Sequence, residues 1–285
     1  MPIKNINYKI LAILPIILAI VSIGIIYVNG LEKSIDVSGG VEITVMVHNN
    51  VNIDELKKML PDGTIVRSAK TASGTFIIIT ANNNVNVDEI NNALKKFLNI
   101  DDLNKVQYSF KQIGPTLSKK FWTDGFKALG FAFIFMAIVV YLVFRTPIPS
   151  GAVVLAAICD IIFAICGMSI FHIPVSTATV AALLMLLGYS VDTDIMLTTR
   201  VLKRGLGSID ERIKGAMKTG LTMSITTIVA MFVLYLVVTF IVPAASVLKD
   251  IAAVLLFGLI GDIMTTWLTN AGILKYYVEE YKGKK

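Results

Sequence analysis

The sequence predicts a polytopic α-helical membrane protein: six transmembrane helices (an RND-type half), with an α+β ferredoxin-like domain between the first helix and the second. Hydrophobic residues make up 55% of the chain and charged residues only 16%, whereas soluble domains carry about a quarter charged residues. The charge is also uneven, because residues 30–120 have the polar density of a soluble domain while 125–270 contain long uncharged runs. We expect the boundaries 1–29 for the first span, 30–122 for the inserted domain and 123–285 for the rest, with a loop at 199–219.

The six apolar runs each approach the ~20 residues needed to cross ~30 Å of hydrocarbon. The first extends from about Ile10 to Val28, and its apolar core is longer than the roughly 7–15 residues of a signal peptide. That length favours a retained helix over the alternative of a cleaved signal. The other runs lie near 125–144, 150–170, 175–198, 221–242 and 248–272.

Basic residues predict the orientation of these spans. Six of them gather in one link between spans, and more follow in the C-terminal tail; the six are Arg200, Lys203, Arg204, Arg212, Lys214 and Lys218. By the positive-inside rule, we expect this link and both termini to be cytoplasmic, in the cell (plasma) membrane, and the inserted domain to be outside. The same rule accounts for the net charge of +6, so we expect no nucleic-acid partner.

The inserted domain contains an internal repeat. Two near-identical segments, Val51-Asn-Ile-Asp-Glu-Leu56 and Val85-Asn-Val-Asp-Glu-Ile90, each begin an amphipathic helix. Alternating segments near 40–47, 64–69, 75–80 and 106–113 predict strands. The order β-α-β-β-α-β is the ferredoxin-like split motif. Its helices cover one sheet face, and the other face stays open for a partner.

Ionisable residues inside the predicted spans are candidates for proton coupling, because each costs about 3 kcal/mol or more at the bilayer centre. They are Asp160, Asp192, Asp194, Asp262 and Lys218. Asp160 and Asp262 have the alternative role of polar links between helices, and Asp194 is near enough to Arg200 to lie at the cytoplasmic interface. Asp192 is the strongest candidate, because it follows Gly188 and Ser190, small residues that allow another helix to approach closely.

Other kinds of chemistry find little support in the sequence. His48 and His172 are isolated, so we expect no metal site. Arg204-Gly-Leu-Gly-Ser208 lacks the spacing of a phosphate-binding P-loop. We therefore expect no cofactor and no enzymatic activity.

Several separate motifs carry a resemblance to a known family. They are Asp36-Val-Ser-Gly39-Gly40 after the first span, Gly114-Pro115 before the second, Phe144-Arg145 at its end, Gly188-Tyr189-Ser190 in the fourth and Ser224-Ile-Thr226-Thr227 in the fifth. Together, in this order, they resemble the SecF proteins of the SecD/SecF family, a branch of the RND superfamily. Bacterial members carry the motif Gly-Tyr-Ser-x-Asn-Asp, whose aspartate corresponds to Thr193 of this chain. Their arginine at the start of the fifth span corresponds to Thr219, beside Lys218. Asp192 instead matches the SecD aspartate, and these departures suggest an archaeal-type member.

The resemblance implies an accessory role in Sec-dependent protein export. It implies SecD and the Sec channel subunits as partners, contact with a translocating unfolded polypeptide and with membrane lipid, and coupling to the proton gradient. Three alternatives stay open. They are an RND-type exporter of lipids or small hydrophobic molecules, an intramembrane aspartyl protease suggested by Gly261-Asp262, and SecD itself, which Asp192 and the segment 267–272 favour.

Overall fold

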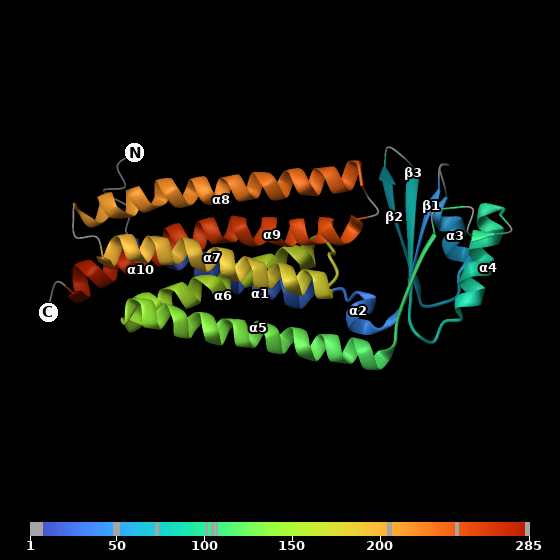
Figure 1. The fold of residues 1–285 in the computed structure, drawn as a ribbon, viewed down its shortest axis with the longest axis horizontal. Coiled ribbons are helices and arrows are strands. Elements are labelled where there is room, and N and C mark those ends of the chain that lie inside the picture. The colour runs from blue at the N-terminus through green and yellow to red at the C-terminus, as the bar shows by residue number, and fades with distance from the viewer. Residues whose placement is uncertain are drawn as a thin grey trace.

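Six helices of the computed structural model are long and apolar enough to cross a membrane. The structure describes residues 8–47, 52–71, 74–100, 102–103, 106, 108–203, 207–242 and 245–282. The spanning helices are α1 (Tyr8–Asn29), α5 (Pro115–Phe144), α6 (Pro147–Ile170), α7 (Thr177–Lys203), α8 (Ile209–Phe240), and a last span made of α9 (Ser246–Met264), η3 (Thr265–Asn270), α10 (Ala271–Tyr276) and η4 (Tyr277–Lys282). They lie side by side at one end of an elongated molecule, and the sheet lies at the other end (Figure 1).

The predicted loop at 199–219 is wrong, because most of it is helical. Helix α7 continues to Lys203 and α8 begins at Ile209. A capping box starts α8: Ser208 accepts from the backbone of Glu211, and the Glu211 carboxylate accepts from the backbone of Ser208. The Arg200 guanidinium then donates to the carbonyl of Gly215 at 2.5 Å, which joins the two helices. The basic residues therefore extend the two helices past the apolar runs.

The inserted domain is a four-stranded antiparallel sheet with two helices on one face. Its strands are β1 (Gly40–Val47), β2 (Thr64–Thr71), β3 (Gly74–Ala81) and β4 (Tyr108–Ile113), and its helices are α3 (Ile53–Met59) and α4 (Val87–Leu98). The strand order is β2-β3-β1-β4. Ile43, Ile77, Leu56 and Ile90 are fully buried in the layer between sheet and helices. The element order along the chain is thus β-α-β-β-α-β, as the repeat predicts.

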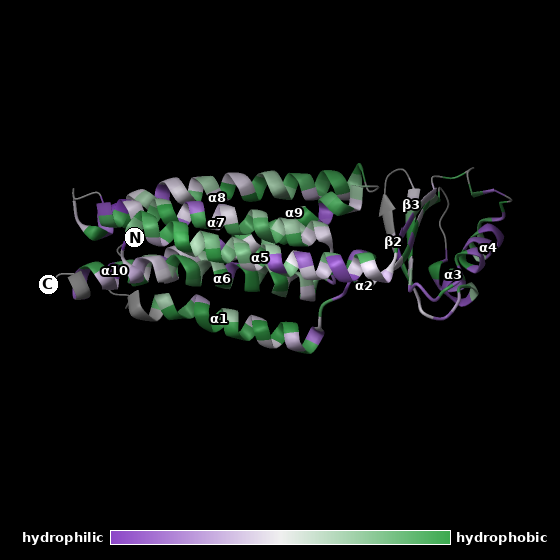
Figure 2. Cartoon of the chain, turned by 60° about the horizontal axis from the view of Figure 1, so that its bottom comes forward, coloured by the Kyte–Doolittle hydropathy of each residue, from purple (hydrophilic) through white to green (hydrophobic). Residues whose placement is uncertain are grey.

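Hydropathy divides the molecule into the same two parts. Green, apolar residues cover the long helices, and purple, polar residues gather on α3, α4 and the link to the membrane helices (Figure 2). Apolar side chains on the outside of α5 are well exposed, with Phe131 at 59% and Phe135 at 64%. Hydrocarbon is the environment that suits such side chains.

A polar joint connects the two parts. The short helix α2 (Ile35–Ser38) carries Asp36, which is 7% exposed. Its carboxylate accepts from the Lys111 ammonium of β4 at 2.7 Å and from the Thr177 hydroxyl at 3.0 Å. Thr177 is the first residue of α7, and its backbone N–H also points at this carboxylate, at 3.4 Å. An acidic group at a helix N-terminus is stabilising, so Asp36 fastens the sheet to the start of α7.

Candidate functional site

Three carboxyl groups are buried together between the membrane helices. Asp160 lies on α6, Asp194 on α7 and Asp262 on α9, and their exposed fractions are 1%, 0% and 0%. Among the described residues, no basic side chain forms a salt bridge with any of the three. Within the same residues, no group of three His, Cys, Asp or Glu is placed to hold a metal ion. Three buried carboxylates without a cation are costly in free energy, so neutral hydrogen-bond donors must stabilise this cluster.

Two hydroxyl groups hold Asp160. Ser190 of α7 donates to Oδ2 and Thr265 of η3 donates to Oδ1, each at 2.5 Å between oxygens. Both donors are fully buried. Asp160 therefore joins α6 to both α7 and the last span.

One hydroxyl group lies between the other two carboxyl groups. Thr266 Oγ1 is 2.9 Å from Asp194 Oδ1 and 3.1 Å from Asp262 Oδ1. A hydroxyl carries one proton and two lone pairs, so Thr266 donates to one carboxylate and accepts from the other when that one is protonated. Asn270 adds a donor to Asp194 at 2.7 Å. Within the described part of the chain, the second oxygens of Asp194 and Asp262 are buried without a hydrogen-bond partner, which leaves each group able to bind a proton.

A change of helix type positions the donors. The last span changes from α-helix to π-helix at η3, which follows Asp262 and begins directly after Met264. Thr265, Thr266, Thr269 and Asn270 are all fully buried in η3. Short π-helical segments are rare and occur frequently at functional sites. Thr265 and Thr266, consecutive residues of η3, contact different carboxyl groups.

Asp192 and Lys218 do not join this cluster. Asp192 is exposed on α7, and Lys218 is exposed on α8. Gly188, which we expected to admit another helix, has nothing within 4 Å of its virtual Cβ position. Asp194 is fully buried between the helices. The helix turns by about 100° per residue, so two aspartates two positions apart face opposite ways, and the buried one is Asp194.

The family motifs form contacts of two kinds. Tyr189 donates from its hydroxyl to the Met223 carbonyl at 2.8 Å and lies 2.6 Å from Thr227 Oγ1, which joins the fourth span to the fifth. Thr226 bonds only to carbonyls of its own helix, those of Thr222 and Met223. The remaining motif residues shape the backbone: Gly39, Gly40 and Arg145 have positive φ, and Gly114-Pro115 begins α5.

Sequence reasoning missed Thr265, Thr266 and Asn270 as partners of the carboxyl groups. These three polar residues follow Asp262 within eight positions of an otherwise apolar span. Polar residues recurring at helical spacing after a membrane aspartate were the available signal. Their contacts reach two other helices, α6 and α7, and the sequence does not reveal how those helices pack against the last span.

The comparisons with known proteins agree with one another. The model of the family "Protein export membrane protein SecD/SecF, C-terminal" matches residues 92–280. The chain is 53% identical to the protein-export membrane protein SecF of Methanocaldococcus jannaschii, over 98% of this chain and 99% of that one. It is 45% identical to SecF of Methanothermobacter thermautotrophicus, over 96% and 93% of the two chains.

A solved structure shares the fold. The crystal structure of SecDF, a translocon-associated membrane protein from Thermus thermophilus, superimposes with a TM-score of 0.73 at 19% identity. The match covers 98% of this chain and 40% of that one.

Proposed function

Because this chain belongs to the SecD/SecF protein-export family, and to its SecF members, we propose that it is an accessory subunit of the Sec machinery. Together with SecD, it assists the movement or release of polypeptides on the outer side of the membrane, and the proton gradient drives this assistance. The observation that carries the proposal is the cluster of Asp160, Asp194 and Asp262 inside the spans. In this proposal the chain performs no covalent chemistry on the polypeptide.

The hydroxyl network supports proton uptake by the cluster. When Asp194 is protonated, its O–H donates to Thr266, and the Thr266 hydroxyl then donates to Asp262. When the proton passes to Asp262, both hydrogen bonds reverse direction. Thr266 stays bonded to both carboxyl groups in each step, so a proton moves between α7 and α9 without exposing a charge to hydrocarbon.

Helix α7 connects the cluster to the inserted domain. It carries Ser190 and Asp194, and its first residue, Thr177, is hydrogen-bonded to Asp36 beside the sheet. A shift of α7 on protonation therefore acts on the joint at Asp36. Such coupling requires packed elements that can adopt two discrete arrangements.

In this proposal the inserted domain is a ferredoxin-like unit outside the cell, and both termini are cytoplasmic. A cleft of about 730 Å³ lies between its open sheet face and the ends of α8 and α9. Charges of both signs line it, from Glu42 and Arg67 on the sheet and from Lys249 and Asp250 on α9, together with several aromatic rings. A mixed lining of this kind supports contact with an extended polypeptide of varied sequence.

An exposed stripe on α7 supports the SecD partnership. Ala181, Met185, Gly188 and Asp192 follow one another at spacings of four, three and four, and all are exposed. Asp192 lies about 12 Å along the axis from Arg200 at the helix end, well inside the span. A carboxylate facing lipid there costs about 3 kcal/mol, so a partner helix of SecD covers this stripe and its aspartate.

Export into sealed vesicles tests the proposal. With SecD and the channel subunits present, an imposed proton gradient accelerates export by the unmodified chain. In Asp194→Asn, the gradient-dependent part falls about tenfold, since losing one charge-assisted hydrogen bond has that effect on an equilibrium. The control is Asp210→Asn, whose carboxylate pairs with Lys275 outside the cluster. Equal acceleration in Asp194→Asn and the unmodified chain would show that the cluster is only structural.

A further inference from the structure

Strand β2 is a free edge of the sheet. The strand order places it at one end, and among the described residues it pairs with β3 alone. Its residues pair without interruption, from Thr64 opposite Ala81 to Thr71 opposite Gly74, so the strand contains no bulge. Its sequence contains no proline. Bulges and prolines are common protections of an edge strand, and β2 has neither of them.

The residues of β3 bond alternately to its two neighbouring strands. The carbonyl oxygen of Ala81 points at β1, because it contacts the position of a Cβ on Gly40. At the other end of the pair, the Val47 carbonyl oxygen of β1 points at β3, 2.7 Å from the position of a Cβ on Gly74. Consecutive residues of an antiparallel strand direct their N–H and C=O groups to opposite sides. The odd-numbered residues of β3 therefore bond to β1, and the even-numbered residues bond to β2.

The outward-facing backbone groups of β2 follow from this alternation. Ile65 and Arg67 lie opposite even-numbered residues of β3, so their N–H and C=O groups bond to that strand. Val66 and Ser68 lie opposite odd-numbered residues, so their N–H and C=O groups point out of the sheet. An added strand can bond to these two residues without disturbing the pairing of β2 with β3.

The free edge borders the cleft between the sheet and the spans. Helices α3 and α4 lie on the side of the sheet away from the spans, so the open face turns toward the ends of α8 and α9 (Figure 1). Arg67 and Ser68 line the cleft, together with Phe232 and Tyr235 of α8 and Phe257 of α9. Strand β4, the other edge of the sheet, contributes no described residue to this lining. Of the two edge strands, β2 is thus the one that lies beside aromatic side chains.

We propose that the polypeptide undergoing export binds as an additional antiparallel strand beside β2. This inference rests on the proposed function, which supplies an unfolded chain on the outer side of the membrane. Hydrogen bonds to the backbone of Val66 and Ser68 hold the chain independently of its sequence, and alternate side chains give the site its preference.

The cleft favours apolar side chains at every second position of the added strand. Side chains alternate between the two faces of a sheet, so the residue opposite Arg67 lies on the open face, beside the cleft. Ile65 lies on the same face and is 58% exposed, which gives this residue an apolar neighbour. The residues opposite Val66 and Ser68 point to the other face, where Ser68 is exposed. The preferred substrate is a segment that alternates apolar and polar residues, the pattern of a half-buried strand.

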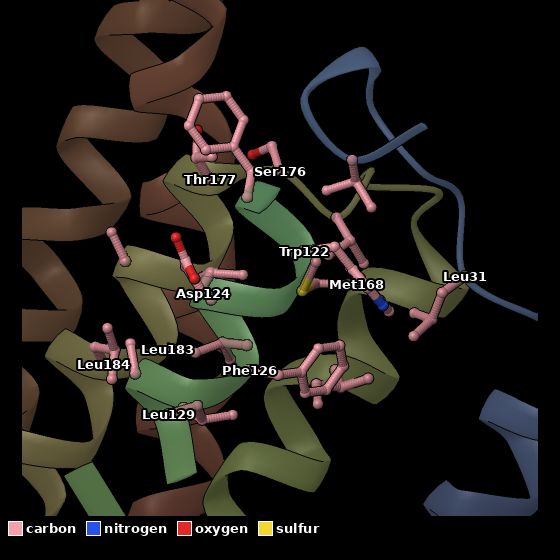
Figure 3. Close-up of a pocket in the computed structure, with 18 residues that line it drawn as sticks. Leu31, Trp122, Asp124, Phe126, Leu129, Met168, Ser176, Thr177, Leu183 and Leu184 are labelled. Atoms are coloured by element: carbon pink, nitrogen blue, oxygen red, sulfur yellow. The ribbon is translucent and has the colours of Figure 1, made fainter. Parts of the chain in front are cut away.

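The cavity between α5, α6 and α7 does not suit an extended polypeptide. It has a volume of about 330 Å³, and Figure 3 shows Trp122 and Phe126 of α5 and the Leu183–Leu184 pair of α7 around it. Its wall is almost entirely apolar, and no strand contributes to it. A polypeptide placed there would leave most of its peptide groups without hydrogen bonds, which is costly. The edge of β2 instead supplies partners to every second residue.

Peptide binding to the full chain in detergent tests this inference without SecD, channel subunits or a gradient. The probe is a short fluorescent peptide of alternating valine and threonine, whose valines face the cleft and whose threonine N–H groups face β2. N-methylation of the threonines should weaken binding about tenfold, because it removes the donors to Val66 and Ser68. N-methylation of the valines should leave the affinity nearly unchanged. Equal weakening by both modifications, or greater weakening by methylated valines, overturns the proposal.

A pair of variants places the peptide at β2. Ser68→Pro removes the outward N–H group, and proline is tolerated on an edge strand where that group faces away from the ladder. Its affinity for the peptide should fall about fivefold, the effect of one hydrogen bond. Ser68→Ala retains the N–H group and should bind as the unmodified chain does. Hydrogen exchange of β1 and β3 amides checks that the sheet stays folded, and equal affinity in the two variants contradicts the proposal.

Hydrogen exchange resolved by residue also separates the possible occupants of the edge. Without peptide, the amides of Val66 and Ser68 should exchange faster than those of Ile65 and Arg67, and saturating peptide should protect the first pair. Protection of that pair without peptide, growing with protein concentration, would assign the edge to a second copy of the chain and overturn the proposal.

The two proposals can fail separately. Absence of peptide binding, while a proton gradient still accelerates export through the unmodified chain and not through Asp194→Asn, overturns only the strand addition. Peptide binding as expected, with equal acceleration in Asp194→Asn and the unmodified chain, overturns only the proton coupling.

Discussion

At the scale of single residues, Gly40 illustrates how a motif position is dictated by space. Its φ is +141°, and a Cβ there would lie 2.3 Å from the Ala81 carbonyl oxygen of the neighbouring strand. A backbone atom cannot move aside as a flexible side chain can. Gly39, with φ +73°, meets instead the side chains of Asn83 and Ser118. The two glycines therefore let the chain turn from α2 into β1 directly beside Asp36.

The first prediction follows from that contact. Gly40→Ala should lower the free energy of opening of the sheet by about 2 kcal/mol more than a substitution at an open position of positive φ, because its Cβ would overlap the Ala81 carbonyl oxygen. Hydrogen exchange of β1 and β3 amides in the full chain measures this as a roughly 30-fold loss of protection. Gly63→Ala is the matched control, because Gly63 also has positive φ, at +87°, but open space around it. A loss of protection of the same size in both variants would show that the contact with Ala81 has no effect.

The aspartates show where single-residue reasoning from the sequence stops. The cost of charge in a span singled out Asp160, Asp194 and Asp262, and the structure buries all three. It ranked Asp192 first, although Asp192 is exposed and Asp194 is buried. The apolar residues around them do not distinguish the inner side of the helix from the outer side, since lipid and protein interior favour the same residues. Only the packing of α7 against α9 decides which aspartate faces inward.

At the scale of elements, the lengths and patterns of the sequence predicted the helices and strands well, but they did not predict the local geometry. The repeat at Val51 and Val85 predicted two helices in equivalent positions, and α3 and α4 occupy them. The extension of α7 and α8 was not predicted, because their ends are charged and the predicted spans were defined by apolar runs. The π-helix η3 escaped because its residues differ little in composition from those of an α-helix. Its two threonines are nevertheless what connects three carboxyl groups.

The second prediction concerns η3. Thr266→Val keeps the shape of the side chain but removes the one hydroxyl shared by Asp194 and Asp262. We expect the gradient-dependent part of export in sealed vesicles to be lost, and the stability of the chain to fall by about 1–3 kcal/mol. Thr266→Ser, which restores the hydroxyl, should recover both.

A matched control separates this effect from the general cost of removing a hydroxyl from a span. Thr239→Val removes a hydroxyl that bonds only to the Tyr235 carbonyl of its own helix. It should leave the response to the gradient intact. If Thr266→Val responds to the gradient as the unmodified chain does, proton transfer through this hydroxyl is ruled out.

At the scale of the whole molecule, two polar contacts among the described residues connect the sheet to the spans. Asp36 joins Lys111 of β4 to the start of α7, and Glu32 joins Arg67 of β2 to His172 between α6 and α7. These contacts lie on opposite edge strands of the sheet. Among the described residues, these contacts hold the inserted domain at both edges of its sheet.

The last prediction concerns the partner that covers Asp192. A photoreactive amino acid at Met185, which is 58% exposed on the α7 stripe, should capture SecD when both chains are in one membrane. The same group at Phe135, 64% exposed on α5, should capture only lipid. Because the two positions are almost equally exposed, a difference between them reports the surface on which the partner binds. Capture of SecD from Phe135 but not from Met185 would place the partner on the far side of the bundle, and Asp192 would then face lipid, at a cost that its sequence context does not explain.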